Sequence, residues 1–268
     1  MAFEELKQRQ GVVWGSAPFE NVADSLVDVH EGIVEAMQPA EGKRWLEVAC
    51  GTGELASVAA RRGASVVGVD LAPALIETAK RQAAADGLEI DYRVGDAENL
   101  DLEDTSFDVV TSTFGVMFAP DQPRAAAELT RVTKPGGRLG LATWRPAGGV
   151  GAMFEMIAPF QPPPPDGAGA PLDWGRPEHV GELLGDAFEL GFEERVTTVE
   201  WASAEEYWQE FSANFGPMKT LVGSLDDDRR DQLHRAWTDL FESPPYGSPG
   251  GPVSHTRDYL LITGTRLL

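Results

Sequence analysis

The sequence is poor in cysteine, in basic residues and in long apolar runs. Its 268 residues contain one cysteine, Cys50, which excludes an internal disulfide and leads us to expect a reducing, cytoplasmic location. Lys and Arg number 22 against 43 Asp and Glu, so the formal net charge is -21. Surfaces that bind phosphate backbones are basic, and a nucleic-acid partner is therefore not expected.

Two further absences lead us to expect neither a membrane-spanning helix nor a metal site. No apolar run approaches the roughly 20 residues of a membrane-spanning helix, and the first residues show no basic-then-apolar export pattern. No metal site is expected, because metal-ligand spacing is missing among the four histidines, His30, His179, His234 and His255. The length and the 42% hydrophobic content suffice for a full core, as one domain or one domain with a cap.

A buried strand, a glycine bend and the start of a helix follow one another between residues 43 and 55. Apolar residues from Trp45 to Ala49 predict the strand, the bend is Gly51-Thr52-Gly53, and Leu55 begins a helical spacing of apolar residues. Such a unit places backbone N–H groups at a helix N-terminus, where a nucleotide-type cofactor binds. The segment therefore predicts a cofactor site.

Two cofactors fit this bend. Residues 51–56 match G-x-G-x-x-A, the dinucleotide fingerprint, and Asp70 ends the next predicted strand, where an acidic residue accepts ribose hydroxyls. Glu47, four positions before Gly51, would be unfavourable beside a pyrophosphate but favourable beside a sulfonium. An NAD(P)-dependent oxidoreductase, or a protein that binds S-adenosylmethionine (SAM) without catalysis, remains an alternative to a methyltransferase.

The segment from Glu47 to Gly53 resembles the first motif of the class I SAM-dependent methyltransferases, with Ala49 in place of the family's first glycine. Further segments similar to this family follow in its order, at residues 70–71, 95–100, 106–112 and 134–139. The resemblance covers about residues 40–145, and the most similar branch is that of ubiquinone and menaquinone biosynthesis. It implies SAM as the cofactor and a small molecule as the methyl acceptor.

The resemblance also implies which residues bind the cofactor. Asp70 would hold the ribose, and the segment after the third strand would contact the adenine. The full set is Glu47, Ala49, Cys50, Gly51, Gly53, Asp70, Leu71, Asp96, Ala97, Glu98, Thr113 and Phe114.

Candidates for acceptor binding and catalysis come from the remaining aromatic and titratable residues. An aromatic-rich second half favours a flat or apolar acceptor, because aromatic rings offer contact area at low entropic cost. The candidates for acceptor binding are Trp14, Met117, Phe118, Trp208 and Phe211. The alternatives are a surface arm that shelters its aromatic residues for Trp14, core packing for Met117 and Phe118, and surface helices packed on the sheet for Trp208 and Phe211. No catalytic residue is identified; His30, His179 and Tyr246 are the candidates for a general base.

Alternating strands and helices predict an α/β fold with a parallel sheet wound on both faces. Four strand-then-helix units are expected between residues 45 and 132, preceded by one helix over 21–37. The family implies a Rossmann-like, seven-stranded, mostly parallel sheet with an antiparallel last strand and a helical cap. We divide the chain into a helical lid (1–40), a SAM-binding core (41–145), a variable insert (146–187) and C-terminal strands with cap helices (188–268). The oligomeric state is left open.

Overall fold

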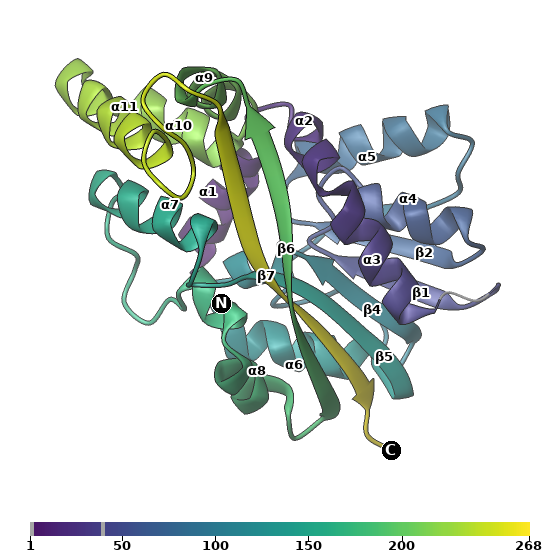
Figure 1. The fold of residues 1–268 in the computed structure, drawn as a ribbon. Coiled ribbons are helices and arrows are strands. Elements are labelled where there is room, and N and C mark those ends of the chain that lie inside the picture. Colours follow the sequence, from purple (N-terminus) through teal and green to yellow (C-terminus); the bar gives the residue numbers. More distant parts are fainter. Residues whose placement is uncertain (1–2, 39–40) are drawn as a thin grey trace.

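A seven-stranded sheet forms the framework of the computed structural model, which describes residues 3–38 and 41–268 (Figure 1). Its order is β3-β2-β1-β4-β5-β7-β6. The strands are β1 (Arg44–Val48), β2 (Ser65–Asp70), β3 (Asp91–Val94), β4 (Phe107–Thr113), β5 (Thr133–Trp144), β6 (Phe188–Trp201) and β7 (Val253–Arg266). Neighbouring strands are parallel from β3 to β5, and β7 is antiparallel to both β5 and β6. The predicted fold class is therefore confirmed.

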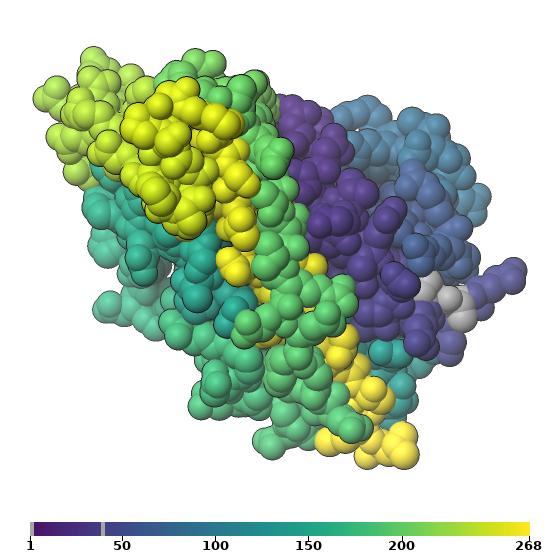
Figure 2. Space-filling view, viewed as in Figure 1, coloured from purple at the N-terminus to yellow at the C-terminus, as the bar shows by residue number. Residues whose placement is uncertain are grey.

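Helices surround this sheet and extend beyond one end of it. They are α1 (Glu4–Trp14), α2 (Glu20–Ala23), α3 (Val27–Met37), α4 (Glu54–Arg61), α5 (Pro73–Ala85), α6 (Gln122–Val132), α7 (Gly149–Ile157), α8 (Pro177–Leu184), α9 (Ala204–Asn214), α10 (Gly216–Ser224) and α11 (Asp227–Phe241). Figure 1 shows α9, α10 and α11 gathered near the upper ends of β6 and β7, with α7 and α1 beside the upper half of β7. In Figure 2 the purple N-terminal segment packs against the green and yellow C-terminal strands.

Local chemistry explains where several of these elements begin. Pro73 opens α5 at a position where its missing N–H costs nothing. The Ser203 hydroxyl caps α9 by accepting a hydrogen bond from the Glu206 backbone N–H at 3.1 Å. In the core, the buried Trp45 indole of β1 donates to the Thr111 hydroxyl of β4 at 2.8 Å, which ties the two central strands together.

The structure differs from the predicted elements at three places. No helix follows β3; the chain runs through turns to β4, and the Arg131 guanidinium donates to the carbonyls of Leu100 and Leu102. The helix predicted over 21–37 is split by a 3-10 turn, Asp24–Leu26. Helices α1 and α10 were not predicted. Glycine at position 11 lets α1 pack closely on the chain after β2, because the Cβ of any other residue would lie 2.9 Å from the Leu71 carbonyl oxygen.

Two absences within the described residues concern membrane insertion and metal binding. Within residues 3–38 and 41–268, no helix has the length and hydropathy needed to cross a bilayer. In the same ranges, His, Cys, Asp and Glu side chains form no group of three or more suited to a metal ion. The predicted boundary between lid and core, at residue 40, lies outside the described residues.

Candidate active site

A cavity opens beyond the carboxyl ends of β1, β2, β3 and β4, where open parallel sheets bind their ligands. Every residue predicted to bind the cofactor lines it, except Gly53. The cofactor half of the cavity is lined by Lys7, Gln10, Glu47, Ala49, Cys50, Gly51, Glu54, Asp70, Leu71, Leu75, Gly95, Asp96, Ala97, Glu98, Thr113 and Phe114. The topology thus brings together residues that are spread over more than 60 positions of the predicted core.

Asp70 holds the glycine bend in place. Its Oδ2 accepts a hydrogen bond from the Gly51 backbone N–H at 2.9 Å, and its Oδ1 accepts one from Ala72 at 2.8 Å. Each carboxylate oxygen has a second lone pair, so Asp70 can still accept a ligand hydroxyl. Burial raises the pKa of Asp70, although these backbone hydrogen bonds oppose the shift.

Glu47 has a structural partner that sequence reasoning missed. It is buried, and its Oε2 accepts a hydrogen bond from the Ala56 backbone N–H at 2.8 Å, in the first turn of α4. Burial, followed by the charge of Glu54, raises the pKa of Glu47 well above its ordinary value, and Asp70 adds to the effect. A cation in the cavity would relieve this accumulation of negative charge.

Two lining residues have backbone conformations that favour glycine. The φ angles of Ala49 and Phe114 are 53° and 54°. Ala49 stands where the family has a glycine, and its neighbour across the bend is Gly115, where a Cβ would lie 2.4 Å from the Ala49 Cβ. Backbone strain of this kind costs about 1–3 kcal/mol per residue and clusters at binding sites.

Gly53 lies outside the cavity lining, and its contact with the cofactor stays a prediction. Its φ is 89°, and a Cβ at this position would lie 2.1 Å from the Tyr92 hydroxyl oxygen. That hydroxyl donates to the Gly53 carbonyl at 3.2 Å. The packing of Tyr92 by itself therefore requires glycine at this position of the bend.

Lys7 covers the cofactor half from α1, and no sequence motif indicated it. Its Nζ lies 2.6 Å from Oδ2 of Asp96 and 2.8 Å from Oε2 of Glu98, and the residue is 3% exposed. Burial lowers the pKa of Lys7, but the hydrogen bonds and charges of Asp96 and Glu98 outweigh it, so the pKa is raised. The lysine ties α1 to the segment that follows β3.

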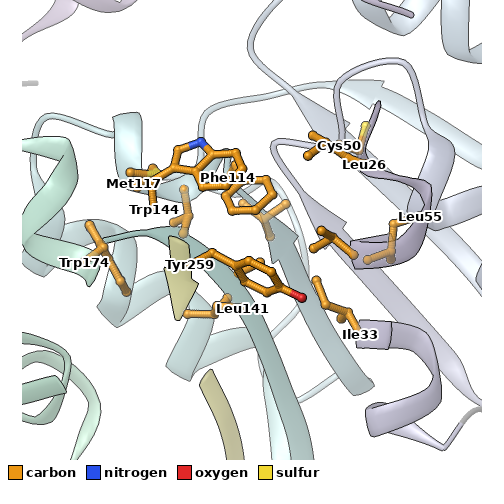
Figure 3. Packing of buried hydrophobic residues seen from close by; sticks show 14 of the residues in the cluster. Leu26, Ile33, Cys50, Leu55, Phe114, Met117, Leu141, Trp144, Trp174 and Tyr259 are labelled. Carbon is orange, nitrogen blue, oxygen red and sulfur yellow. The ribbon is translucent and has the colours of Figure 1, made fainter. Parts of the chain in front are cut away.

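Aromatic side chains dominate the other half of the cavity. Trp14 makes edge contacts with Phe118 and Phe215 at centroid distances of 4.9 and 5.3 Å. The Phe114 ring stacks on the Trp144 ring at a centroid distance of 3.6 Å, and Figure 3 shows these two rings together. This half is lined by Trp14, Phe19, Val22, Ala23, Leu26, His30, Gly115, Phe118, Ala119, Pro120, Trp144, Val150, Met153, Phe154, Tyr207, Phe211, Phe215, His255 and Arg257. Trp14, Phe118 and Phe211 are thus among the predicted acceptor-binding residues that line it.

Two other acceptor candidates lie elsewhere. Met117 is fully buried in the core and does not line the cavity. Trp208 packs against Trp237 and His234 on the outer side of α9. Core packing, the alternative for Met117, describes that residue, whereas Trp208 packs between helices α9 and α11.

Of the candidate bases, His30 alone lines the cavity. Burial lowers the pKa of His30 to about 4, and its buried Nδ1 has no hydrogen-bond partner in the described part of the chain. His179 is hydrogen-bonded to Gln122 at 2.7 Å, away from the cavity lining. Tyr246 packs on Phe241 and His255 and does not reach the lining either.

The comparison with known proteins agrees with this geometry. Residues 46–141 match the family described as "Methyltransferase domain". "Uncharacterized protein Rv1405c" of Mycobacterium tuberculosis is 37% identical over 199 residues, which are 73% of this chain and 72% of the relative. The demethylmenaquinone methyltransferase of Thermus thermophilus is 41% identical over 126 residues, covering 44% and 57% of the two chains.

The chain belongs to the class I SAM-dependent methyltransferases. A solved structure, the YcgJ protein of Bacillus subtilis, shares the fold with a TM-score of 0.60 at 18% identity, over 89% of this methyltransferase and 98% of that chain. The similarity to the quinone-biosynthesis branch, predicted from the sequence, is confirmed by the Thermus relative.

The residues of the cavity fit the cofactor of this methyltransferase, which is SAM. Its sulfonium and ammonium groups are cationic, and the buried carboxylates of Glu47 and Asp70, with the half-buried one of Glu54, line one half of the cavity. Gly51, at φ 56°, has only the Phe19 ring near its open side, so the bend admits a close ligand. An NAD(P)-dependent oxidoreductase is not favoured.

Proposed function

We propose that this methyltransferase transfers the methyl group to a small, flat, apolar or aromatic molecule held in the aromatic half of the cavity. The observation that carries this proposal is the wall of rings formed by Trp14, Phe118, Phe211 and Phe215 next to the cofactor half. Ring walls of this kind bury a flat ligand with little loss of side-chain entropy.

The cofactor half would hold SAM through residues of this chain. Glu47 and Glu54 would face its cationic methionyl part, Asp70 its ribose, and the segment from Asp96 to Glu98 its adenine. When bound, SAM would supply an activated methyl group: an electron pair of the acceptor would attack the methyl carbon in line, and the sulfur would leave as the neutral thioether of the demethylated cofactor. The remaining task of the protein is to align the acceptor and to exclude water.

His30 is the candidate for handling a proton of the acceptor. It is 6% exposed, and the low pKa keeps its imidazole neutral at physiological pH. A neutral ring with a free Nδ1 can accept a hydrogen bond from an acceptor hydroxyl and orient it. The name of the Thermus relative specifies demethylmenaquinone as acceptor, which supports a ring-shaped acceptor here.

The predicted division of the chain is carried forward as part of this proposal. The lid (1–40) and the C-terminal segment (188–268) would close over the core (41–145) from two sides, because α1 and α9 both contribute aromatic residues to the cavity wall. The insert (146–187) contributes Val150, Met153 and Phe154.

A transfer assay tests the proposal. Purified protein is incubated with methyl-labelled SAM and one candidate acceptor at a time. The acceptors are naphthols, quinols and aliphatic control compounds, and the labelled product of each is measured. Label on one or more flat aromatic compounds is the expected result. Trp14→Ala should raise the KM for the acceptor, whereas Trp208→Ala, the matched change outside the cavity, should leave it near the original value. SAM binding with transfer only to aliphatic polar compounds would contradict the proposal.

A further inference from the structure

Arg257 is a buried cation in the aromatic half of the cavity. It is 8% exposed, it lines the cavity from β7, and its guanidinium carbon lies 5.7 Å from the centroid of the Trp144 ring. Nη1 donates to the Ser25 hydroxyl at 3.1 Å, and Nη2 donates to the Ser25 carbonyl at 2.8 Å. These two bonds use two of the five N–H donors of arginine, and the buried Nε–H has no hydrogen-bond partner among residues 3–38 and 41–268.

The charge of Arg257 is not neutralised by a neighbouring carboxylate. None of the ion pairs within residues 3–38 and 41–268 includes it, whereas Arg145 pairs with Glu194 and Arg195 with Glu193 on the neighbouring strand. Asp28 acts on Arg257 only through its charge, from an exposed position where solvent screens it. A buried charge without a paired opposite charge is costly, so this position favours a ligand that brings the opposite charge.

Charge is distributed unequally along the cavity. Carboxylates line the half that suits the cationic cofactor, and Arg257 lines the other half among aromatic rings. Two neutral imidazoles accompany it: His30, and His255, whose Nδ1 lies 2.9 Å from the Tyr207 hydroxyl oxygen. Burial, together with the charge of Arg257, lowers the pKa of His255 to about 4 and keeps it neutral. Arginine is therefore the cation that an acceptor meets in this half.

We propose that the methyl acceptor carries an ionised oxygen on its flat apolar body, and that Arg257 binds this oxygen and sets which acceptors enter the site. The inference rests on the proposed function, since it specifies the acceptor of that same cavity. A carboxylate and an ionised phenol or enol share the required chemistry, because each presents an oxyanion to a guanidinium. The net charge of -21 does not prevent an anionic acceptor from binding, because salt screens the repulsion from charges more than about 8–10 Å away.

Ligand binding tests this assignment without catalysis. Quenching of tryptophan fluorescence gives the affinity of two pairs of probes for the SAM-saturated protein: naphthoate with its neutral amide, and a hydroxynaphthoquinone ionised at neutral pH with its methyl ether. We expect at least one anion to bind about tenfold or more tightly than its neutral partner, because charge-assisted hydrogen bonds are roughly twice as strong as neutral ones. The pair that shows the preference identifies the carboxylate or the ionised hydroxyl as the recognised group.

Variants then assign the preference to one side chain. Arg257→Met should reduce the preference to less than about threefold, while Arg195→Met, the same change of charge on β6 outside the cavity lining, should retain it. The SAM affinity of each variant, measured separately, shows whether the cavity is intact. Equal affinities for anion and neutral partner in the unsubstituted protein would overturn the inference without any variant, and so would a preference that survives Arg257→Met. If the unsubstituted protein does not bind SAM, the proposed function itself is wrong.

Discussion

Gly53 and Gly87 both have positive φ angles, but their surroundings differ. A Cβ at Gly53 would lie 2.1 Å from the Tyr92 hydroxyl oxygen, whereas a Cβ at Gly87 would have no described residue within 4 Å apart from its chain neighbours. Gly87→Ala should therefore cost only the left-handed backbone conformation, about 1–2 kcal/mol. Gly53→Ala should cost a further 1–3 kcal/mol, roughly, for displacing the buried Tyr92 ring. Urea unfolding of the two variants checks this, and equal losses would show that the ring moves without cost.

Glu47 should make SAM binding dependent on pH. Its folded-state pKa is raised, so the stability that it contributes falls as the pH rises from its ordinary value of 4.5 through the raised value. A cationic ligand favours the ionised form, and the affinity for SAM should rise over the same interval, tenfold for each unit by which binding lowers the pKa.

Calorimetry in buffers of different ionisation enthalpy measures the proton released by SAM binding. Glu47→Gln keeps an acceptor for the Ala56 N–H but cannot ionise, so its proton release should be smaller. Glu77→Gln, an exposed change on α5, serves as the control. Identical proton release in Glu47→Gln and the unsubstituted protein would contradict the assignment of the titration to Glu47.

At the scale of single residues, the sequence predicted those side chains that belong to a contiguous motif. Glu47, Gly51 and Asp70 were found because a strand, a bend and the following strand place them at fixed spacing. Lys7 and Arg257 were missed for the opposite reason: each reaches the cavity from an element at one end of the chain, and its partner is distant in sequence. Burial of a lone cation has no local sequence signal.

Among the helices, α1 is tied over the cofactor half by Lys7, which pairs with both Asp96 and Glu98. Removing one partner of a fully buried ion pair costs about 3–5 kcal/mol of stability. The cost is smaller here, because the Asp96 carboxylate is partly exposed to solvent. Lys7→Met should therefore increase amide hydrogen exchange throughout α1 and weaken SAM binding. Arg9→Met, the same change at an exposed position of the same helix, should do neither. Unchanged exchange in Lys7→Met would show that the aromatic contacts of Trp14 suffice.

The success of element prediction followed the strength of local signals. Proline at the first position is typical of a helix start, and α8 runs from Pro177 to Leu184; serine followed three residues later by glutamate is a capping-box pattern, and the Ser203 hydroxyl caps α9. Helix α1 escaped prediction because few of its residues are apolar, and tertiary contacts such as Gly11 against Leu71 hold it in place. The segment after β3 formed no helix because Arg131 satisfies its carbonyl groups from α6. At each place where the element prediction was wrong, packing between segments distant in the sequence determined the observed structure.

At the scale of the whole molecule, the cavity joins charges of opposite sign within a strongly acidic protein. The acidic half follows from the family motif, since the strand ends of a wound sheet converge there. The aromatic half is assembled from α1, the segment before α3, the loop after β4, the end of β5, α7, α9, the start of α10 and β7, and no single stretch of sequence encodes its shape. Cofactor class was therefore predictable, and the polarity of the acceptor half was not.

Cofactor binding should stabilise the whole fold, because it joins α1, the bend after β1 and the ends of β2 to β4 through one ligand. SAM at 100 times its dissociation constant adds about 2.7 kcal/mol to the free energy of unfolding. For a chain of 268 residues this corresponds to a rise in melting temperature of roughly 5–10 °C. NADH at the same concentration should leave the melting temperature unchanged, because the carboxylates that favour a sulfonium repel a pyrophosphate. Differential scanning calorimetry with each ligand gives the comparison, and a shift produced by NADH but not by SAM would refute the assignment of the cavity.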